Sequence, residues 1–199
     1  MWAFEVASIR HGPTRRGDEP TPSLLRVPDE TAHMRRTGPW SNEEAATFLE
    51  SATVPVRLAC RTPDGGLWML SLWYEWVGGD EPELCCATGA DADVVRYLRA
   101  NDEVAFEVST NDPPYRGVRG RGTATIEPDE GKALLRSLLE RYLGGTDNEL
   151  GAFLLDDERE EVRIRISPER LHSWDFTDRM RDVTAEADAP TPSRLRGPD

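Results

Sequence analysis

Alternation of apolar and polar residues is the feature that most limits how this chain can fold. In the clearest example Val104, Phe106 and Val108 are apolar, while the residues between them are small or charged. A side-chain period of two gives a strand one apolar face, whereas a helix needs a period of 3.6. Strands of a parallel sheet are buried on both faces and are almost continuously apolar, so the pattern favours antiparallel pairing. The same pattern recurs over residues 54–60, 67–77, 83–87, 104–108, 118–126 and 162–166. We therefore predict a mainly β (α+β) fold, a small six-stranded antiparallel barrel.

Short helices are predicted between these strands. Ser41 and Glu44 form a capping-box pattern that opens a helix through Leu49. The strongest helical pattern covers 129–143, where leucines recur on one stripe and Gly144 ends the helix. Weaker helical patterns cover 91–100 and 150–155. We expect these helices to flank the barrel.

The two ends of the chain differ in composition from its middle. Residues 1–40 are rich in Pro, Arg and Thr and have no clear periodicity, and residues 181–199 contain several prolines. Such segments have too few apolar residues to form a core. We predict a disordered extension over 1–40, one domain over 41–180 and a disordered tail over 181–199. The extension also lacks the acidic bias of the domain, so we expect Met34 to be the natural start.

The chain is strongly acidic, with 37 Asp and Glu residues against 24 Lys and Arg and a formal net charge of −13. This charge repels nucleic acids and anionic membranes, so neither is an expected partner. Arginine supplies 23 of the 24 basic residues and Lys132 is the only lysine, a usage that resembles halophilic archaeal proteins. The acidic runs are then solvated surface, and no metal site is predicted.

Few residues are available for nucleophilic or metal chemistry. Cys60, Cys85 and Cys86 lie in apolar segments without a CxxC pair, which is typical of small buried side chains in a reducing compartment. Only three histidines occur. No 18-residue apolar run and no signal-peptide core is found, so we expect a cytoplasmic protein.

Positive charge is concentrated in the string Tyr-Arg-Gly-Val-Arg-Gly-Arg-Gly at residues 115–122. The planar guanidinium group suits phosphate and carboxylate, and glycines let the backbone approach a ligand closely. This string is the best candidate for an anion site. The alternative is that its arginines pair with surface carboxylates, as ordinary surface arginines do.

The order of these elements and several local strings together resemble the pyridoxamine 5'-phosphate oxidase-like family. These are the FMN-binding split barrels, which include the coenzyme F420 (deazaflavin) reductases. The resembling strings are residues 54–59, 70–76, 86–89, 101–108, 115–122 and 166–170, with Trp174 after them. The resemblance covers about 41–180 and implies a split β-barrel. It also implies a homodimer with two cofactor sites at the subunit interface.

The resemblance also implies which residues meet the cofactor. In that family the isoalloxazine ring lies against the second and third strands, and the matching positions are Ser71, Trp73, Tyr74 and Thr88. Judged from the residues alone, an aromatic strand of this kind is equally consistent with barrel core or with a dimer interface.

The chain departs from the family where relatives hold the phosphate. In place of their Ser-x-Lys segment, residues 90–96 read Ala-Asp-Ala-Asp-Val-Val-Arg. A carboxylate repels a phosphate dianion, so positive charge must come from elsewhere. The arginines expected to supply it are Arg57, Arg96, Arg116 and Arg119. Trp174 is expected to cover the site, the alternative being a tryptophan that closes the core.

The resemblance implies an oxidoreductase that uses FMN, or alternatively F420, on a small organic substrate. Because the cofactor supplies the redox chemistry, no protein nucleophile is needed and no catalytic residue is assigned. A proton donated by His172 is one option, and a structural histidine is the other. The alternative function is a non-catalytic split-barrel protein that binds flavin, heme or another small ligand. A third reading is a dimeric barrel without a ligand, with Arg116, Arg119 and Arg121 paired to surface acids.

Overall fold

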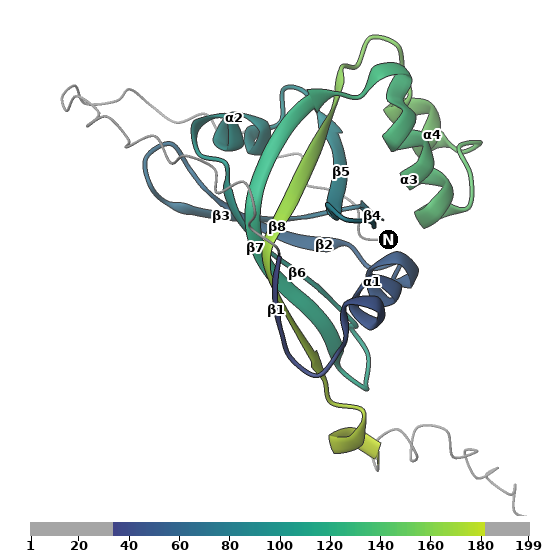
Figure 1. Ribbon diagram of the computed structural model, residues 1–199. Coiled ribbons are helices and arrows are strands. Elements are labelled where there is room, and N and C mark those ends of the chain that lie inside the picture. The colour runs from purple at the N-terminus through teal and green to yellow at the C-terminus, as the bar shows by residue number, and fades with distance from the viewer. Residues whose placement is uncertain (1–33, 182–199) are drawn as a thin grey trace, which may run out of the picture. The chain divides into compact units, whose positions relative to one another are not determined.

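The computed structural model describes residues 34–181 (Figure 1). In this part of the chain the strands are β1 Arg35–Thr37, β2 Val56–Arg61, β3 Leu67–Leu72, β4 Tyr74–Val77, β5 Glu83–Gly89, β6 Glu103–Ser109, β7 Arg116–Pro128 and β8 Glu161–Asp175. The helices are α1 Asn42–Ser51, α2 Asp93–Ala100, α3 Ala133–Leu143 and α4 Glu149–Leu154, with short 3-10 turns at Glu130–Lys132 and Asp178–Met180.

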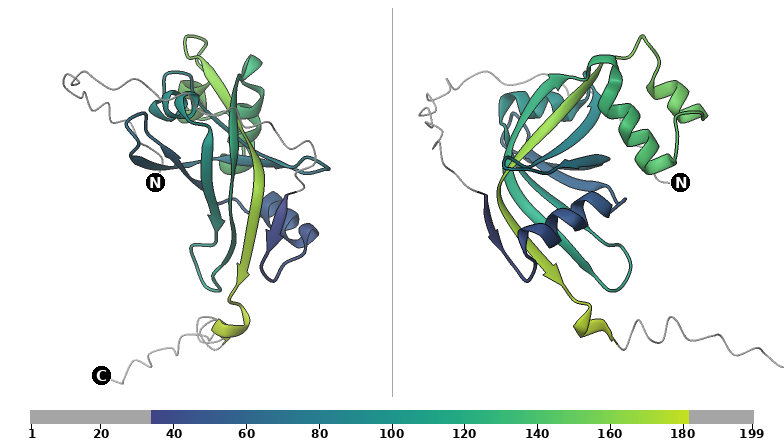
Figure 2. Two further views of the ribbon diagram at one scale, coloured as in Figure 1. Left: turned by 60° about the vertical axis from the view of Figure 1, so that its left-hand side comes forward. Right: turned by 45° about the vertical axis from the view of Figure 1, so that its right-hand side comes forward.

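The strands form one sheet in the order β3-β2-β6-β7-β8-β5-β4, and β1 pairs with β8 beside it. Every pair is antiparallel except β1 with β8. The sheet is strongly curved, and α1 lies on its concave side (Figure 2). The predicted mainly β, antiparallel barrel with short flanking helices is therefore confirmed.

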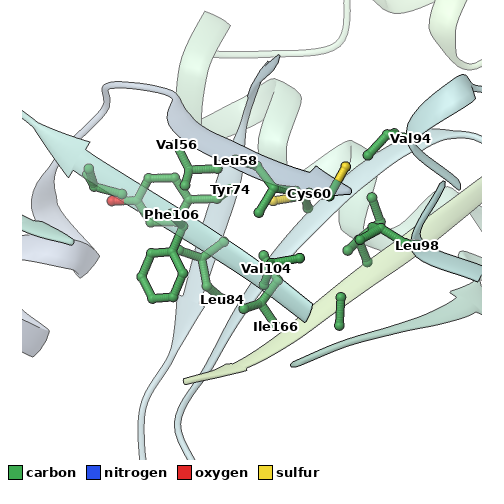
Figure 3. Packing of buried hydrophobic residues seen from close by; sticks show 14 of the residues in the cluster. Val56, Leu58, Cys60, Tyr74, Leu84, Val94, Leu98, Val104, Phe106 and Ile166 are labelled. Carbon is green, nitrogen blue, oxygen red and sulfur yellow. The ribbon is translucent and has the colours of Figure 1, made fainter. Parts of the chain in front are cut away.

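The core is formed by side chains on the concave face of the sheet (Figure 3). Leu58, Phe106 and Ile166 come from three different strands and are all buried, as are Val94 and Leu98 of α2. Burying a side chain of this size stabilises the fold by about 1.5–3 kcal/mol. Because alternate residues face inward, their neighbours along each strand must face the opposite, convex side.

Helix α3 covers the outer face of β5. Cys85 of β5 packs against Leu134 and Leu138 of α3. Asp129, whose side chain is fully buried, accepts hydrogen bonds from the N–H groups of Leu134 (3.0 Å) and Leu135 (2.9 Å). These bonds satisfy two donors that a helix start otherwise leaves unpaired. Strand β5 is thus buried on both faces.

The C-terminal end of α3 ties the helix to the rest of the domain. The ring of Tyr142 stacks on Trp73 with centroids 5.3 Å apart. The Arg141 guanidinium donates to the carbonyl groups of Leu49 (3.3 Å) and Ala52 (2.7 Å) at the end of α1. These contacts connect α3 to both α1 and the sheet.

The structure has more strands than the six predicted. The segment 67–77 is two strands, because the chain leaves the sheet at Trp73 and β4 pairs with β5 rather than continuing along β2. Strand β1 lies inside the predicted disordered extension, so strand structure begins before residue 41. The remainder of that extension, 1–33, and the tail from 182 onward lie outside the described residues.

Strand β8 also continues beyond residue 166, where the last predicted strand ends, so that predicted boundary is wrong. Gly122 pairs with Pro168 and Arg121 pairs with Arg170, which leaves Glu169 as an extra residue in a β-bulge. Proline has no N–H to donate, and a bulge is one of the few places where a sheet accepts it. The bulge lets β8 run on to Asp175.

Glycines allow β7 to pack closely between β6 and β8. A Cβ added at Gly120 would lie 2.5 Å from the Phe106 ring and 2.6 Å from the Arg170 carbonyl oxygen. At Gly122 an added Cβ would collide with the Ser167 backbone. Because backbone atoms cannot rotate away as side chains do, these positions require glycine.

Replacing Gly120 with valine tests this requirement. We expect Gly120→Val to lower the free energy of unfolding by about 1–3 kcal/mol or more, as overpacking a well-filled core does. Urea denaturation followed by tryptophan fluorescence measures the loss. Thr125→Val, at an exposed position of the same strand, is the control. Equal stability of the two variants would contradict the close packing of β7.

Candidate functional site

A trough crosses the convex face of the sheet over β2, β6, β7 and β8, away from β5, whose outer face α3 covers. It has a volume of about 740 Å³. Five strands and β1 contribute the residues that line it, which are Thr37, Arg57, Ala59, Met69, Ala105, Phe106, Glu107, Arg119, Gly120, Arg121, Arg170 and His172. A cavity of this size is typical of a site for a small ligand or cofactor.

Strand register arranges the lining residues in two rows. The row of Ser71, Arg57, Glu107, Arg119, His172 and Thr37 runs from β3 to β1. The neighbouring row is Met69, Ala59, Ala105, Arg121, Arg170 and Arg35. Two residues along a strand separate the rows, a spacing of about 7 Å. The two-residue period of the sequence thus collects these side chains on one face.

The middle of the trough has a floor of small residues. Ala59 and Ala105 are cross-strand partners on β2 and β6, and Gly120 lies beside them on β7. None of these residues has a side chain larger than a methyl group. A flat ligand can therefore lie close to the sheet between the longer side chains.

Arg57 is held by several polar partners. Its guanidinium donates to Ser109 Oγ (3.0 Å) and Asn111 Oδ1 (2.7 Å), and it lies 3.5 Å from Glu107 Oε1. Ser109 Oγ donates in turn to Glu107 Oε1 at 2.9 Å. This network fixes the Glu107 carboxylate, the one acidic side chain among those that line the trough.

Arg119 is positioned by an aromatic ring instead of a carboxylate. Its guanidinium carbon lies 5.6 Å from the centroid of Trp174. The indole passes over Gly117, where an added Cβ would lie 2.8 Å from it. A cation–π contact leaves the N–H groups of arginine available to a ligand.

At the β1 side of the trough, Thr37 Oγ1 and His172 Nδ1 are hydrogen-bonded at 2.9 Å.

The structure brings three of the nine predicted site residues together. Arg57 and Arg119 line the trough, and Trp174 lies against Arg119. Ser71 is at the far end of the Arg57 row. Arg116 lies at the start of β7, opposite Asp175 and away from the trough.

The other four residues lie elsewhere. Trp73 packs on Tyr142 of α3, and Thr88 is on β5 opposite Val162. Tyr74 is completely buried in the core, does not line the trough, and its hydroxyl donates to the Leu49 carbonyl at 2.8 Å.

Arg96, on α2, also lies away from the trough. It pairs with Asp93 at 2.6 Å, and the hydrogen bond raises the pKa of the guanidinium. This ion pair neutralises the only basic residue of the segment 90–96. The segment 90–96 therefore offers no unpaired positive charge to an anionic group of a ligand.

The sequence prediction missed several lining residues. Ala59, Ala105 and Met69 face the trough because they alternate with buried residues, a signal that the sequence contains. Arg170 was missed because the last strand was predicted over 162–166 only, whereas β8 runs to Asp175. Thr37 lay inside the predicted extension. The β-bulge brings Arg170 to the trough, and the pairing of β1 with β8 brings Thr37 there. Neither feature has a clear sequence pattern.

A second cavity, of about 580 Å³, lies beside the start of α3. Several of its charged groups are already paired: Lys132 Nζ donates to the carbonyls of Leu154 and Asp156, and Arg159 lies 3.3 Å from Glu161. Burial raises the pKa of Glu161. The contacts of this cavity are those of a structural charge cluster.

All three cysteines of the chain are buried. Burial raises the pKa of the Cys85 thiol to about 11 and also raises those of Cys60 and Cys86. Since the thiolate is the reactive form, none of these residues is suited to nucleophilic chemistry near neutral pH.

Thiol labelling tests this conclusion. We expect a thiol reagent at pH 8 to label the native protein slowly and to label three thiols per chain after unfolding. Because the folded state favours the neutral thiol, stability should also fall as the pH rises above about 9. Rapid stoichiometric labelling of native protein would contradict the buried placement.

The solved structures that are similar to this chain include two at 28% and 30% sequence identity. One is the conserved hypothetical protein Rv2991 from Mycobacterium tuberculosis, at 28% sequence identity and a TM-score of 0.56, covering 79% of this chain and 93% of that one. The other, described as an F420 reductase, has 30% identity and a TM-score of 0.52, covering 62% of this chain and 92% of that one. The first match shows that the fold is a split barrel, as predicted. The chain belongs to the split-barrel family that contains this F420 reductase.

Scans against protein-family models and curated proteins give no match. Within residues 34–181, no helix has the length and apolar character needed to cross a membrane. The same residues contain no group of three or more His, Cys, Asp or Glu side chains suited to a metal ion.

Proposed function

We propose that the protein binds a flavin or deazaflavin cofactor, FMN or F420, in the trough and acts as an oxidoreductase on a small organic substrate. The observation that carries this proposal is the trough itself, a floor of small residues bordered by Arg119, Arg121 and Arg170, which form no ion pair with a carboxylate of residues 34–181. The similarity to an F420 reductase at 30% identity supports it.

The floor suits a planar ring system. Ala59, Ala105 and Gly120 present no projecting side chain, and Met69 adds an exposed, polarisable group at one end. The volume of about 740 Å³ lies within the range of about 300–1,000 Å³ that small-molecule sites occupy.

The arginines suit the anionic part of either cofactor. Arg119 keeps its N–H donors free because Trp174 supports its cationic face. Bidentate hydrogen bonds from guanidinium to phosphate are stronger than neutral hydrogen bonds, and they also fix orientation. A bound flavin or deazaflavin supplies the electron or hydride transfer. The chain itself orients the ring and holds its anionic group.

A non-catalytic role is the second candidate, with flavin, heme or another small ligand bound without turnover. This second role is favoured because the carboxylate of Glu107 and the imidazole of His172, both in the trough, already have hydrogen-bond partners. Glu107 is held by Arg57 and Ser109, and His172 by Thr37. Turnover of a bound cofactor with a reductant and a substrate distinguishes the two candidates.

Cofactor binding tests the proposal directly. We expect the wild-type protein to bind FMN or F420 near one per subunit, and Arg119→Gln to weaken binding about tenfold or more, because a charged hydrogen bond is lost. The measurements are the visible absorption spectrum and parallel fluorescence titrations. Arg99→Gln, an exposed arginine of α2, is the matched control. Failure of the wild type to bind either cofactor would reject the proposal.

The homodimer implied by the family resemblance is part of the proposal. Two large apolar side chains, Leu67 and Met69, are 81% and 66% exposed on β3, at the same face as the trough. Apolar side chains this exposed are better buried against a partner, and a second copy of the chain would cover them.

The dimer prediction concerns Met69. Its replacement with glutamate places a charge in the proposed interface, so Met69→Glu should be monomeric where the wild type is dimeric. Light scattering after size-exclusion chromatography measures the mass. Val77→Glu, at an exposed apolar position of β4, serves as the control. A dimeric Met69→Glu protein would place the interface elsewhere.

A further inference from the structure

The trough holds one acid among four arginines. Of the side chains that line it, only Glu107 is a carboxylate, and the arginines are Arg57, Arg119, Arg121 and Arg170. A carboxylate repels an anionic ligand. An acid at this position therefore weakens the binding of an anion, and its presence calls for another role.

Glu107 is not required to hold Arg57 in place. The Arg57 guanidinium donates shorter hydrogen bonds to Ser109 Oγ (3.0 Å) and Asn111 Oδ1 (2.7 Å), whereas it lies 3.5 Å from Glu107 Oε1. The two charged side chains are 37% and 39% exposed. An ion pair as exposed as this one adds little to the stability of the fold.

One oxygen of the Glu107 carboxylate is still available to a ligand. The hydrogen bond from Ser109 Oγ, at 2.9 Å, and the contact with Arg57 both end on Oε1. No residue between 34 and 181 donates a hydrogen bond to Oε2. Arg57 likewise keeps N–H donors, because a guanidinium has more of them than its contacts use. The Arg57–Glu107 pair therefore offers a donor beside an acceptor.

This pair lies at the edge of the small-residue floor. Arg57 and Glu107 are cross-strand partners on β2 and β6. Arg57 lies two residues along β2 from Ala59. Glu107 lies two residues along β6 from Ala105, and this spacing is about 7 Å. A flat ring on the floor therefore meets the pair with its edge and not with its face.

An uncharged edge fits the pair better than a charged group does. A cation at Glu107 would lie beside the Arg57 guanidinium, and an anion at Arg57 would lie beside the Glu107 carboxylate, so each would meet a like charge. A carbonyl next to an N–H avoids both, because the carbonyl accepts from Arg57 while the N–H donates to Glu107. Lactams and cyclic imides carry such an edge.

We propose that the Arg57–Glu107 pair binds the lactam or imide edge of a flat ring lying on the floor of the trough. This inference rests on the proposed function and gives the bound ring an orientation. The pyrimidine end of FMN and of F420 carries a cyclic imide, so the pair takes that end in either cofactor. Glu107 thereby acts on the ring and not on the anionic chain.

The experiment compares ligands that differ only at the imide nitrogen. The first pair is FMN and FMN methylated on that nitrogen, which has no hydrogen to donate there. The second pair is naphthalimide and N-methylnaphthalimide, flat imides without flavin chemistry. Fluorescence titrations are made with the wild type and with Glu107→Leu, and F420 is titrated in parallel. Glu103→Leu is the matched control, because Glu103 is an exposed acid on the same face of β6 and outside the trough.

We expect the wild type to bind FMN about tenfold or more tightly than methylated FMN, because methylation removes a charged hydrogen bond. In Glu107→Leu the two forms should bind within about threefold of each other, since the acceptor is gone. Glu107→Gln keeps an acceptor oxygen and should retain part of the preference. The naphthalimides should follow the same pattern, and Glu103→Leu should match the wild type. The affinity ratio separates the imide contact from any general loss that a substitution causes.

A preference for unmethylated FMN that is as large in Glu107→Leu as in the wild type would overturn the inference and leave cofactor binding intact. Equal wild-type affinities for the methylated and unmethylated forms would overturn it as well. If the wild type binds neither FMN nor F420 but distinguishes the two naphthalimides through Glu107, the imide contact stands and the proposed cofactor function fails. Binding of none of these ligands would overturn both.

Discussion

The domain depends on the close packing of β7 against both of its neighbours. This strand pairs with β6 on one side and β8 on the other along much of its length. Gly120 and Gly122 allow the contact, since a single Cβ at either position meets backbone atoms. The position of β7 in turn sets the register that aligns Arg119 with His172 and Arg121 with Arg170. Fold and candidate site therefore share one physical requirement.

The glycines have a second effect on the convex face. Gly117 leaves room for the Trp174 indole, and the indole supports Arg119. Residues that the sequence shows as one Arg-Gly string thus separate into two roles. The glycines leave room for neighbouring groups on both faces of the strand. The arginines between them direct their side chains to the face that holds the trough. The string is one site only because the strand has a period of two.

Much of the fold could be predicted from local patterns. The capping box at Ser41 and Glu44 is present in α1, and the alternating segments are strands. Features set by long-range packing could not be predicted. The family resemblance implied that Tyr74 meets the cofactor, while the residues alone left barrel core equally open, and in the structure its hydroxyl donates to the Leu49 carbonyl of α1 in the core. The turn at Trp73 follows from its stacking on Tyr142, a residue distant in the chain.

The uncovered arginines on one face of a chain with 37 acidic residues give the molecule an asymmetric electric field. Potential of this kind steers a diffusing anion toward the basic face and speeds its capture. The effect is limited by the Debye length, which falls from about 10 Å at 0.1 M salt to about 3 Å at 1 M. The same trough therefore attracts its ligand from a distance in dilute buffer, and at molar salt acts only at contact.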